Sequence, residues 1–111
     1  MSNKRPGRLA TRALIFAALG DETRLLVLAR LSDGHPQSIS RLTSGTNLTR
    51  QAVTKHLQVL AHAGVVRNVR SGRESLFELE PQPIEDVRNY LDQVSKQWDD
   101  ALARLKAQVE D

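Results

Sequence analysis

Residues 37 to 64 hold the pattern that most constrains the fold of this chain, because they predict two short helices separated by a tight turn. The hydroxyl of Ser38 can cap the first helix, and that of Thr49 can cap the second. Between them, residues 44 to 47 are serine, glycine, threonine and asparagine, which favour turns. Gly64 can end the second helix in a left-handed conformation. The stretch is therefore predicted to form a helix-turn-helix.

The second helix of this pair has one apolar side and one polar side. Its apolar residues fill a broad arc at helical spacing, and they are Ala52, Val53, Leu57, Val59, Leu60, Ala61 and Ala63. Amide and cationic side chains suit the edges of DNA bases, and the N-terminal part of such a helix lies in the major groove. No carboxylate interrupts the polar face. We therefore expect this helix to bind DNA through Thr49, Arg50, Gln51, Thr54, Lys55 and Gln58.

A polar face is weak evidence alone, because many surface helices carry one simply to face water. The distribution of charge adds to it. Residues 35 to 75 contain six arginine or lysine residues against one glutamate, whereas residues 76 to 111 contain nine acids against four bases. Basic charge gathered on one part of the chain is expected where only one face meets a polyanion.

The segment after Gly64 predicts a β-hairpin. Residues 65–70 and 75–80 have the composition of two short strands, with a turn at Ser71 and Gly72. Directly after a DNA-reading helix, this hairpin would form a wing whose tip arginines, Arg70 and Arg73, contact phosphates or a neighbouring minor groove. The alternative is a hairpin tip that faces only water. The position of the hairpin and its paired arginines favour the wing.

Two largely apolar helices are predicted before the helix-turn-helix. Residues 9–19 are apolar on most sides, so part of their cover is expected from a second subunit. The next helix follows an N-cap at Asp21 and is apolar nearly all round from Leu25 to Leu31, which predicts the central strut of the core. Arg24 and Arg30 are expected at its solvated edge.

A long helix is predicted over residues 84–109, after Pro81 and Pro83. Its apolar positions recur every seven residues at Ile84, Leu91, Trp98 and Leu105, with Val87, Val94 and Ala101 between them. Such a helix is longer than a small core can cover, so we interpret this seam as a dimer contact. The interface is assigned to Phe16, Leu91, Val94, Trp98 and Leu105. The alternative, a ligand pocket lined by Trp98 and Tyr90, is less favoured because aromatic stripes at helical spacing are more often core.

The length of 111 residues supports one domain, residues 9–111, after a flexible basic segment at residues 1–8. Arg5 and Arg8 could reach phosphates or a minor groove, although a solubilising tail is the favoured interpretation.

The chain has no cysteine and no signal peptide or long apolar run, which predicts a soluble, cytoplasmic protein without contact to a membrane. It has no phosphate-binding glycine loop and no nucleophile motif, so no enzyme activity is expected.

The predicted order of elements resembles the bacterial ArsR/SmtB-type transcriptional repressors over nearly the whole chain. FAALGDETRLLVLARL is similar to that family's second-helix signature, LTRQAVTKHLQVLAHAGVV to its recognition helix, and RSGRESLFELEP to its wing. The resemblance implies a mostly α fold with a small β-hairpin, a dimeric winged helix-turn-helix of order α-α-α-α-β-β-α. It also implies a homodimer that occupies a palindromic double-stranded DNA operator and blocks transcription until a signal weakens binding.

Many members of that family sense metals, and here this chain departs from the pattern. SISRLT has none of the cysteines of one family site, and the last helix has acids but no histidine for the other. His56 and His62 project to different sides of one helix, His56 packed and His62 solvated, while His35 lies in a loop. We expect no metal site and no cofactor, and the identity of any effector stays open. The alternative function is a winged-helix protein-interaction module without DNA binding, against which the basic, carboxylate-free face argues.

Overall fold

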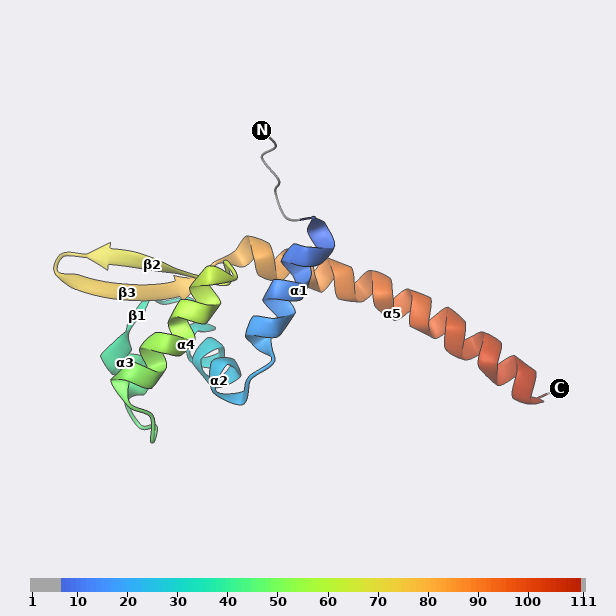
Figure 1. Cartoon of the computed structure of the whole chain (residues 1–111), viewed down its shortest axis with the longest axis horizontal. Helices are drawn as coiled ribbons and strands as arrows, with labels where there is room; N and C mark the ends of the chain where they lie inside the picture. The colour runs from blue at the N-terminus through green and yellow to red at the C-terminus, as the bar shows by residue number, and fades with distance from the viewer. Residues whose placement is uncertain (1–6, 111) are drawn as a thin grey trace.

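A small winged core carries one long projecting helix in the computed structural model, which describes residues 7 to 110 (Figure 1). The elements in chain order are α1 (Arg8–Leu19), α2 (Glu22–Leu31), β1 (Gln37–Ser38), α3 (Ile39–Thr43), α4 (Arg50–His62), β2 (Val66–Ser71), β3 (Glu74–Leu79) and α5 (Pro81–Glu110). The predicted mostly helical, winged helix-turn-helix fold is confirmed. Arg5 lies outside the described residues. Arg8, expected in the flexible segment, is instead the first residue of α1.

Side-chain caps begin three of the helices, as the sequence predicts. Asp21, Ser38 and Thr49 each accept the backbone N–H of the residue three positions later, at 3.0 to 3.1 Å. Each cap satisfies an N–H group that the first helical turn cannot pair. At the other end of α4, Gly64 has a φ of +80°. A side chain would be strained in that conformation, which explains why a glycine ends the helix.

The core lies where α1 to α4 meet the hairpin. Its largest fully buried side chains are Leu31, Leu42, Leu57, Leu60, Val27, Val53 and Val65. Burying each such side chain stabilises the fold by about 1.5 to 3 kcal/mol. Helix α4 supplies three of them, and this fixes which of its sides faces outward. Val59 and Ala61, at the rim of the predicted apolar arc, are exposed.

The strands form one antiparallel sheet in the order β1-β3-β2. Strand β1 was not expected from the sequence, and it pairs Gln37 with Phe77. In the hairpin, Ser71 pairs with Glu74, so the turn consists of Gly72 and Arg73 and lies one residue later than predicted. Gly72 has a φ of +62°, and glycine at the first turn position is typical of a two-residue hairpin turn.

Helix α2 differs from the expected fully buried strut. Val27 and Leu31 are buried, but Leu25 is 53% exposed and Leu26 is exposed as well. The helix therefore covers the core with one face only. Arg24 and Arg30, expected at its solvated edge, are partly buried and donate hydrogen bonds to backbone carbonyl groups.

Helix α5 begins at Pro81, three residues earlier than predicted, and runs away from the core (Figure 1). Its first turns pack on α1, where the ring of Tyr90 lies 6.0 Å from that of Phe16, measured between centroids. The guanidinium of Arg12 lies 4.7 Å above the same Tyr90 ring. Beyond this contact the helix leaves the core. Within residues 7–110, no helix is long and apolar enough to cross a membrane.

Candidate nucleic-acid interface

Helix α4 carries the candidate reading face, which we define as Gln51, Lys55 and Gln58. These residues are three and four positions apart and therefore lie on one side of the helix. All three are exposed, whereas Val53 and Leu57 on the opposite side are fully buried. Burial of the apolar side thus holds the amide and ammonium groups outward. Arg50, at the edge of this face in the first turn, is exposed too.

The two threonines predicted to bind DNA already have partners within the helix. The Thr54 hydroxyl donates to the carbonyl oxygen of Arg50 at 2.8 Å, so it has no proton left for a base or phosphate and can only accept. The Thr49 hydroxyl accepts the N–H of Ala52 as the N-cap, which leaves its own proton free to donate. Thr49 is therefore a candidate donor to a phosphate, and Thr54 is not.

The hairpin presents Arg70 on β2 and Arg73 in the turn, and both are exposed. Arg67 on the same strand is different. Its Nε donates to Oε1 of Glu78 at 2.7 Å, and Glu80 lies 3.8 Å away. The hydrogen bond to Glu78 raises the pKa of the Arg67 guanidinium. The positive charge of Arg67 is locally neutralised, so the count of bases in the sequence overstates the charge that the wing can offer to DNA.

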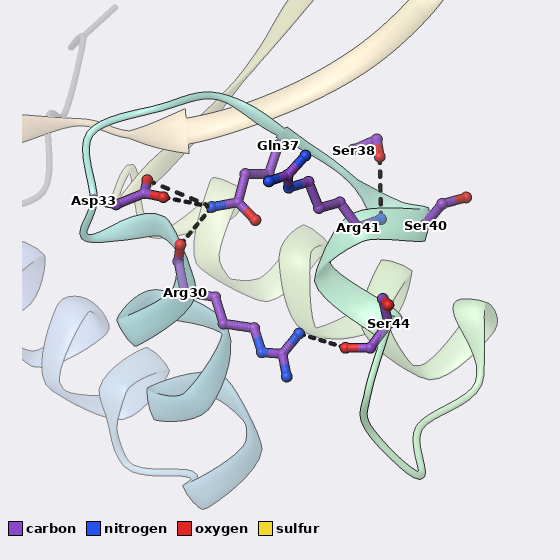
Figure 2. A pocket seen from close by; sticks show the side chains of 7 residues that line it. All are labelled: Arg30, Asp33, Gln37, Ser38, Ser40, Arg41 and Ser44. Carbon is purple, nitrogen blue, oxygen red and sulfur yellow. Dashed lines mark hydrogen bonds between the residues drawn. The ribbon is translucent and has the colours of Figure 1, made fainter.

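Arg41 on α3 is a candidate contact that the sequence prediction left out. It is exposed and lines a shallow groove of about 730 Å³ with Ser38, Ser40 and Ser44 (Figure 2). The signal was available, because Arg41 is the single base of α3 and the first helix of a helix-turn-helix crosses the DNA backbone.

The same groove also contains Asp33 and Arg30, and the guanidinium of Arg30 is already hydrogen-bonded within the chain. Asp33 accepts the backbone N–H of His35, and this bond lowers the pKa of the Asp33 carboxyl. The guanidinium of Arg30 donates to the carbonyl oxygen of Ser44 at 2.6 Å, at the C-terminal end of α3 (Figure 2). Of the two groove arginines, Arg41 is thus the one placed to meet a phosphate, and Arg30 holds the turn of the motif.

The histidines lie apart from one another. His35 and His62 are exposed, while the His56 side chain is 24% exposed and its Nδ1 lies 3.4 Å from Nη1 of Arg24. The expected packed and hydrogen-bonded environment of His56 is confirmed. In the described part of the chain, no group of three histidine, aspartate or glutamate side chains could hold a metal ion together.

The predicted interface residues lie along α1 and α5. Phe16 and Val94 are partly buried, but Leu91, Leu105 and Trp98 are exposed, Trp98 to 66%. Tyr90 packs against α1, while Trp98 lies eight residues further on, about 12 Å along the helix. Within one chain, Trp98 is exposed and is not packed with Tyr90, and the alternative of a ligand pocket lined by both residues stays a prediction.

Comparison with known proteins finds a family model that matches part of the chain and proteins that are similar to it over most of their length. A family model described as a helix-turn-helix domain matches residues 19–69, from the end of α1 into β2. An uncharacterized HTH-type transcriptional regulator of Bacillus subtilis, YuzN, is 37% identical over 79 residues, which is 66% of this chain and 86% of that protein.

A solved structure and a further relative agree with these matches. The structure of an ArsR-like transcriptional regulator from Rhodococcus sp. RHA1 is 36% identical, with a TM-score of 0.78, and the match covers 91% of this chain and 94% of that one. The HTH-type transcriptional repressor SmtB of Mycobacterium tuberculosis is 28% identical over 88 residues, which is 79% of this chain and 63% of that protein.

Proposed function

This chain belongs to the ArsR family of winged helix-turn-helix transcriptional regulators, and we propose that it is a homodimeric repressor that occupies a palindromic operator. As a member of this family it is a DNA-binding regulator and not an enzyme. The single observation that carries the proposal is the orientation of α4. Its buried apolar side leaves Gln51, Lys55 and Gln58 pointing outward as a continuous polar face.

Each exposed side chain suits a different part of DNA. An amide such as that of Gln51 can pair with the N6 and N7 edge of adenine, and the ammonium of Lys55 can donate to O6 and N7 of guanine. The exposed arginines suit phosphates, which position a protein on DNA without specifying sequence. We assign the phosphate contacts to Arg41, Arg50, Arg70 and Arg73, with Thr49 as a further donor.

A dimer is proposed because a single α4 reaches only half of a symmetric site. Leu91, Trp98 and Leu105 leave an apolar seam about 21 Å long on α5, and the core of this chain does not cover it. A second copy of the same helix is a self-complementary partner for such a seam. Two reading faces related by two-fold symmetry would then match a palindromic operator.

Repression is the simplest consequence of operator binding, because the chain can block a promoter by occupying it. The family contains a relative that is named a repressor, SmtB of Mycobacterium tuberculosis. We therefore propose repression for this chain too.

The decisive experiment is selection of bound duplexes from a randomised library, followed by titration at several salt concentrations. We expect a two-fold symmetric sequence with half-sites about one helical turn, roughly 34 Å, apart, and affinity that falls steeply with salt. Equal affinity for every duplex, or binding that does not respond to salt, would contradict operator recognition. Binding to no duplex at all would favour the protein-interaction module.

A further inference from the structure

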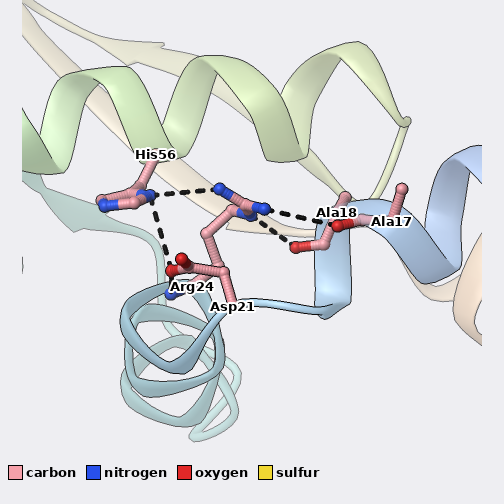
Figure 3. Close-up of polar contacts among 5 residues, drawn as sticks. All are labelled: Ala17, Ala18, Asp21, Arg24 and His56. Atoms are coloured by element: carbon pink, nitrogen blue, oxygen red, sulfur yellow. Dashed lines mark hydrogen bonds and ion pairs between the residues drawn. The ribbon is translucent and has the colours of Figure 1, made fainter.

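Arg24 of α2 lies where α1, α2 and α4 meet (Figure 3). Its Nε donates to the carbonyl oxygen of Ala18 at 2.6 Å, and its Nη2 donates to that of Ala17 at 3.3 Å. Its Nη1 lies 3.4 Å from Nδ1 of His56 on α4. The backbone N–H of Arg24 donates to Asp21, which caps α2. Arg24 thus links its own helix, α2, to both α1 and α4.

The chemistry of arginine explains why it occupies this position. The last carbonyl groups of α1 lack the N–H groups of a following helical turn, and from the backbone that of Ala17 accepts only the capping N–H of Gly20, at 3.3 Å. A cation is also favourable at that end of the helix dipole. The guanidinium carries five N–H donors in a rigid, planar fork, so Arg24 can serve α1 and His56 at once. A lysine could bind one of these partners, but its single ammonium lacks the fixed geometry that links them.

The contact with Arg24 sets a requirement on the His56 ring. A guanidinium can only donate, so a hydrogen bond between the two residues needs the His56 tautomer in which Nδ1 accepts and Nε2 carries the proton. Oδ2 of Asp21 lies 3.8 Å from the same Nδ1. Asp21 is held there by the Arg24 N–H, which is also the main cause of the lowered pKa of the Asp21 carboxyl.

These are directional contacts in a place where the remaining packing is apolar. Hydrophobic burial is non-directional, and the fit of apolar side chains restricts the angle between two packed helices only to preferred values with a scatter of about 15 to 20°. Hydrogen bonds depend steeply on geometry and can define it. Among residues 7–110, Arg24 makes the side-chain hydrogen bond between α4 and the α1–α2 corner, through His56, and its two bonds to Ala17 and Ala18 hold that corner together.

We propose that Arg24 and His56 are positioning residues that fix the angle between α1 and α4, and thereby the separation of the two reading faces in the dimer. The second half of this statement rests on the proposed function. Helix α4 has thirteen residues and is about 20 Å long. A rotation of roughly 10° about one end would move the other end by about 3 Å, close to the spacing of successive nucleotides along a strand.

The angle can be measured without DNA, because the chain contains no cysteine and accepts labels at chosen sites. Thr11→Cys on α1 and Gln51→Cys on α4 place two spin labels at exposed positions in one chain. Mixing with excess unlabelled protein restricts the measured distance to labels within one chain. We expect one narrow distance distribution, and we expect His56→Leu or Arg24→Lys to broaden or shift it.

Two further variants decide whether the hydrogen bonds set the angle. His56→Gln restores an acceptor for Arg24 and should restore the narrow distribution. Arg30→Ala is the matched control, because Arg30 lies on the same helix and also donates to two carbonyl groups, but those groups belong to Leu42 and Ser44. It should leave the distance unchanged. An unchanged distance in His56→Leu and Arg24→Lys, no recovery in His56→Gln, or an equal change in Arg30→Ala would overturn the proposal.

A second experiment measures the affinity for DNA. It uses the duplex selected from the randomised library, in versions whose half-site separation differs by one base pair at a time. The wild-type protein should prefer one separation by about tenfold, and His56→Leu should reduce that preference to about twofold while binding to a random duplex persists. A loss of folded protein would lower all affinities alike and leave the preference intact, which would overturn the positioning role. If the wild type itself shows no preferred separation, the operator proposal fails, and the spin-label distances still test the junction.

Discussion

Helices α4 and α5 both present a continuous row of exposed side chains, but the two rows differ in chemistry. The row on α4 is made of amides and cations above a fully buried apolar side. The row on α5 is made of Leu91, Trp98 and Leu105, and Val87 is the buried residue of that helix. The first row is compatible with water, whereas the second exposes apolar surface that burial would stabilise.

The two rows are therefore evidence of different strength for the proposed partners, which are DNA for the row on α4 and a second subunit for the row on α5. A polar face permits DNA binding and also permits simple solvation, so its function needs an independent test. An apolar seam of several turns on a protruding helix is unfavourable unless something covers it. The dimer is thus the more strongly supported proposal, and the reading of a palindrome depends on it.

The largest effect is expected from the centre of the seam. Trp98 is 66% exposed in the single chain, so Trp98→Ala should hardly disturb the core, but loss of a tryptophan buried by a partner costs about 3 to 5 kcal/mol. Much of this loss should appear as weaker association, and Trp98→Glu should abolish both association and operator binding. Sedimentation equilibrium measures the association of each variant.

Leu25 provides a matched control for this experiment, because it is 53% exposed but lies on α2, away from the seam. Leu25→Glu should leave association unchanged. A wild-type protein that is monomeric at micromolar concentration, with tryptophan emission typical of a water-exposed ring, would remove the difference between the two helices and the repressor mechanism with it.

The next largest effect is expected on the reading face of α4. Gln51→Ala or Lys55→Ala should reduce the discrimination between operator and random duplex by about 1 to 3 kcal/mol each, because a base contact is lost. His62→Ala is the control, since His62 is exposed on the same side at the far end of the helix. Competition titrations with both duplexes measure the discrimination. If Gln51→Ala and Lys55→Ala reduce the discrimination no more than His62→Ala does, the exposed face of α4 does not read bases.

A smaller effect is expected from the wing. Arg73→Ala should weaken binding to all duplexes alike and reduce the slope of log affinity against log salt by about one unit, as loss of a phosphate contact does. Arg67→Ala should leave the slope unchanged, because Glu78 already neutralises that charge. Salt titrations of both variants make the test. A change of sequence preference in Arg73→Ala would mean that this residue reads bases.

Much of the winged core could be predicted from the sequence because its signals are local. The caps at Asp21, Ser38 and Thr49 lie within three residues of the groups they bind, and Gly64 ends its own helix. Strand β1 could not be predicted in this way. It is two residues long and depends on Phe77, forty residues away in the sequence, for its partner.

The roles of the individual arginines were also beyond the sequence. Helical spacing placed Arg24 and Arg30 at a solvated edge, since it shows which side of a helix is polar and not which neighbour that side meets. In the fold, both cap the ends of other helices. Arg67 is neutralised across the hairpin, and Arg41 is exposed on α3. The number of bases was predictable, but not which of them are free to bind a phosphate.

The smallest expected effect is a loss of stability at acid pH that arises from the Asp21 cap in the winged core and not from the seam on α5. The Arg24 N–H lowers the pKa of Asp21 from its ordinary value of 3.8. A carboxyl with a lowered folded pKa contributes stability that is complete above its unfolded pKa and is lost as the pH falls through the folded value. The urea midpoint of unfolding of the wild type should therefore decrease below about pH 4.

Asp21→Asn keeps a side chain that can cap α2 but removes the charge, so its midpoint should decrease less steeply. Asp33→Asn should act in the same direction, because the N–H of His35 lowers the pKa of Asp33. Urea titrations from pH 6 to 2.5 at one fixed protein concentration measure the effect, since the stability of a dimer depends on its concentration. If Asp21→Asn follows the wild-type curve throughout, acid sensitivity does not arise from this cap in the core.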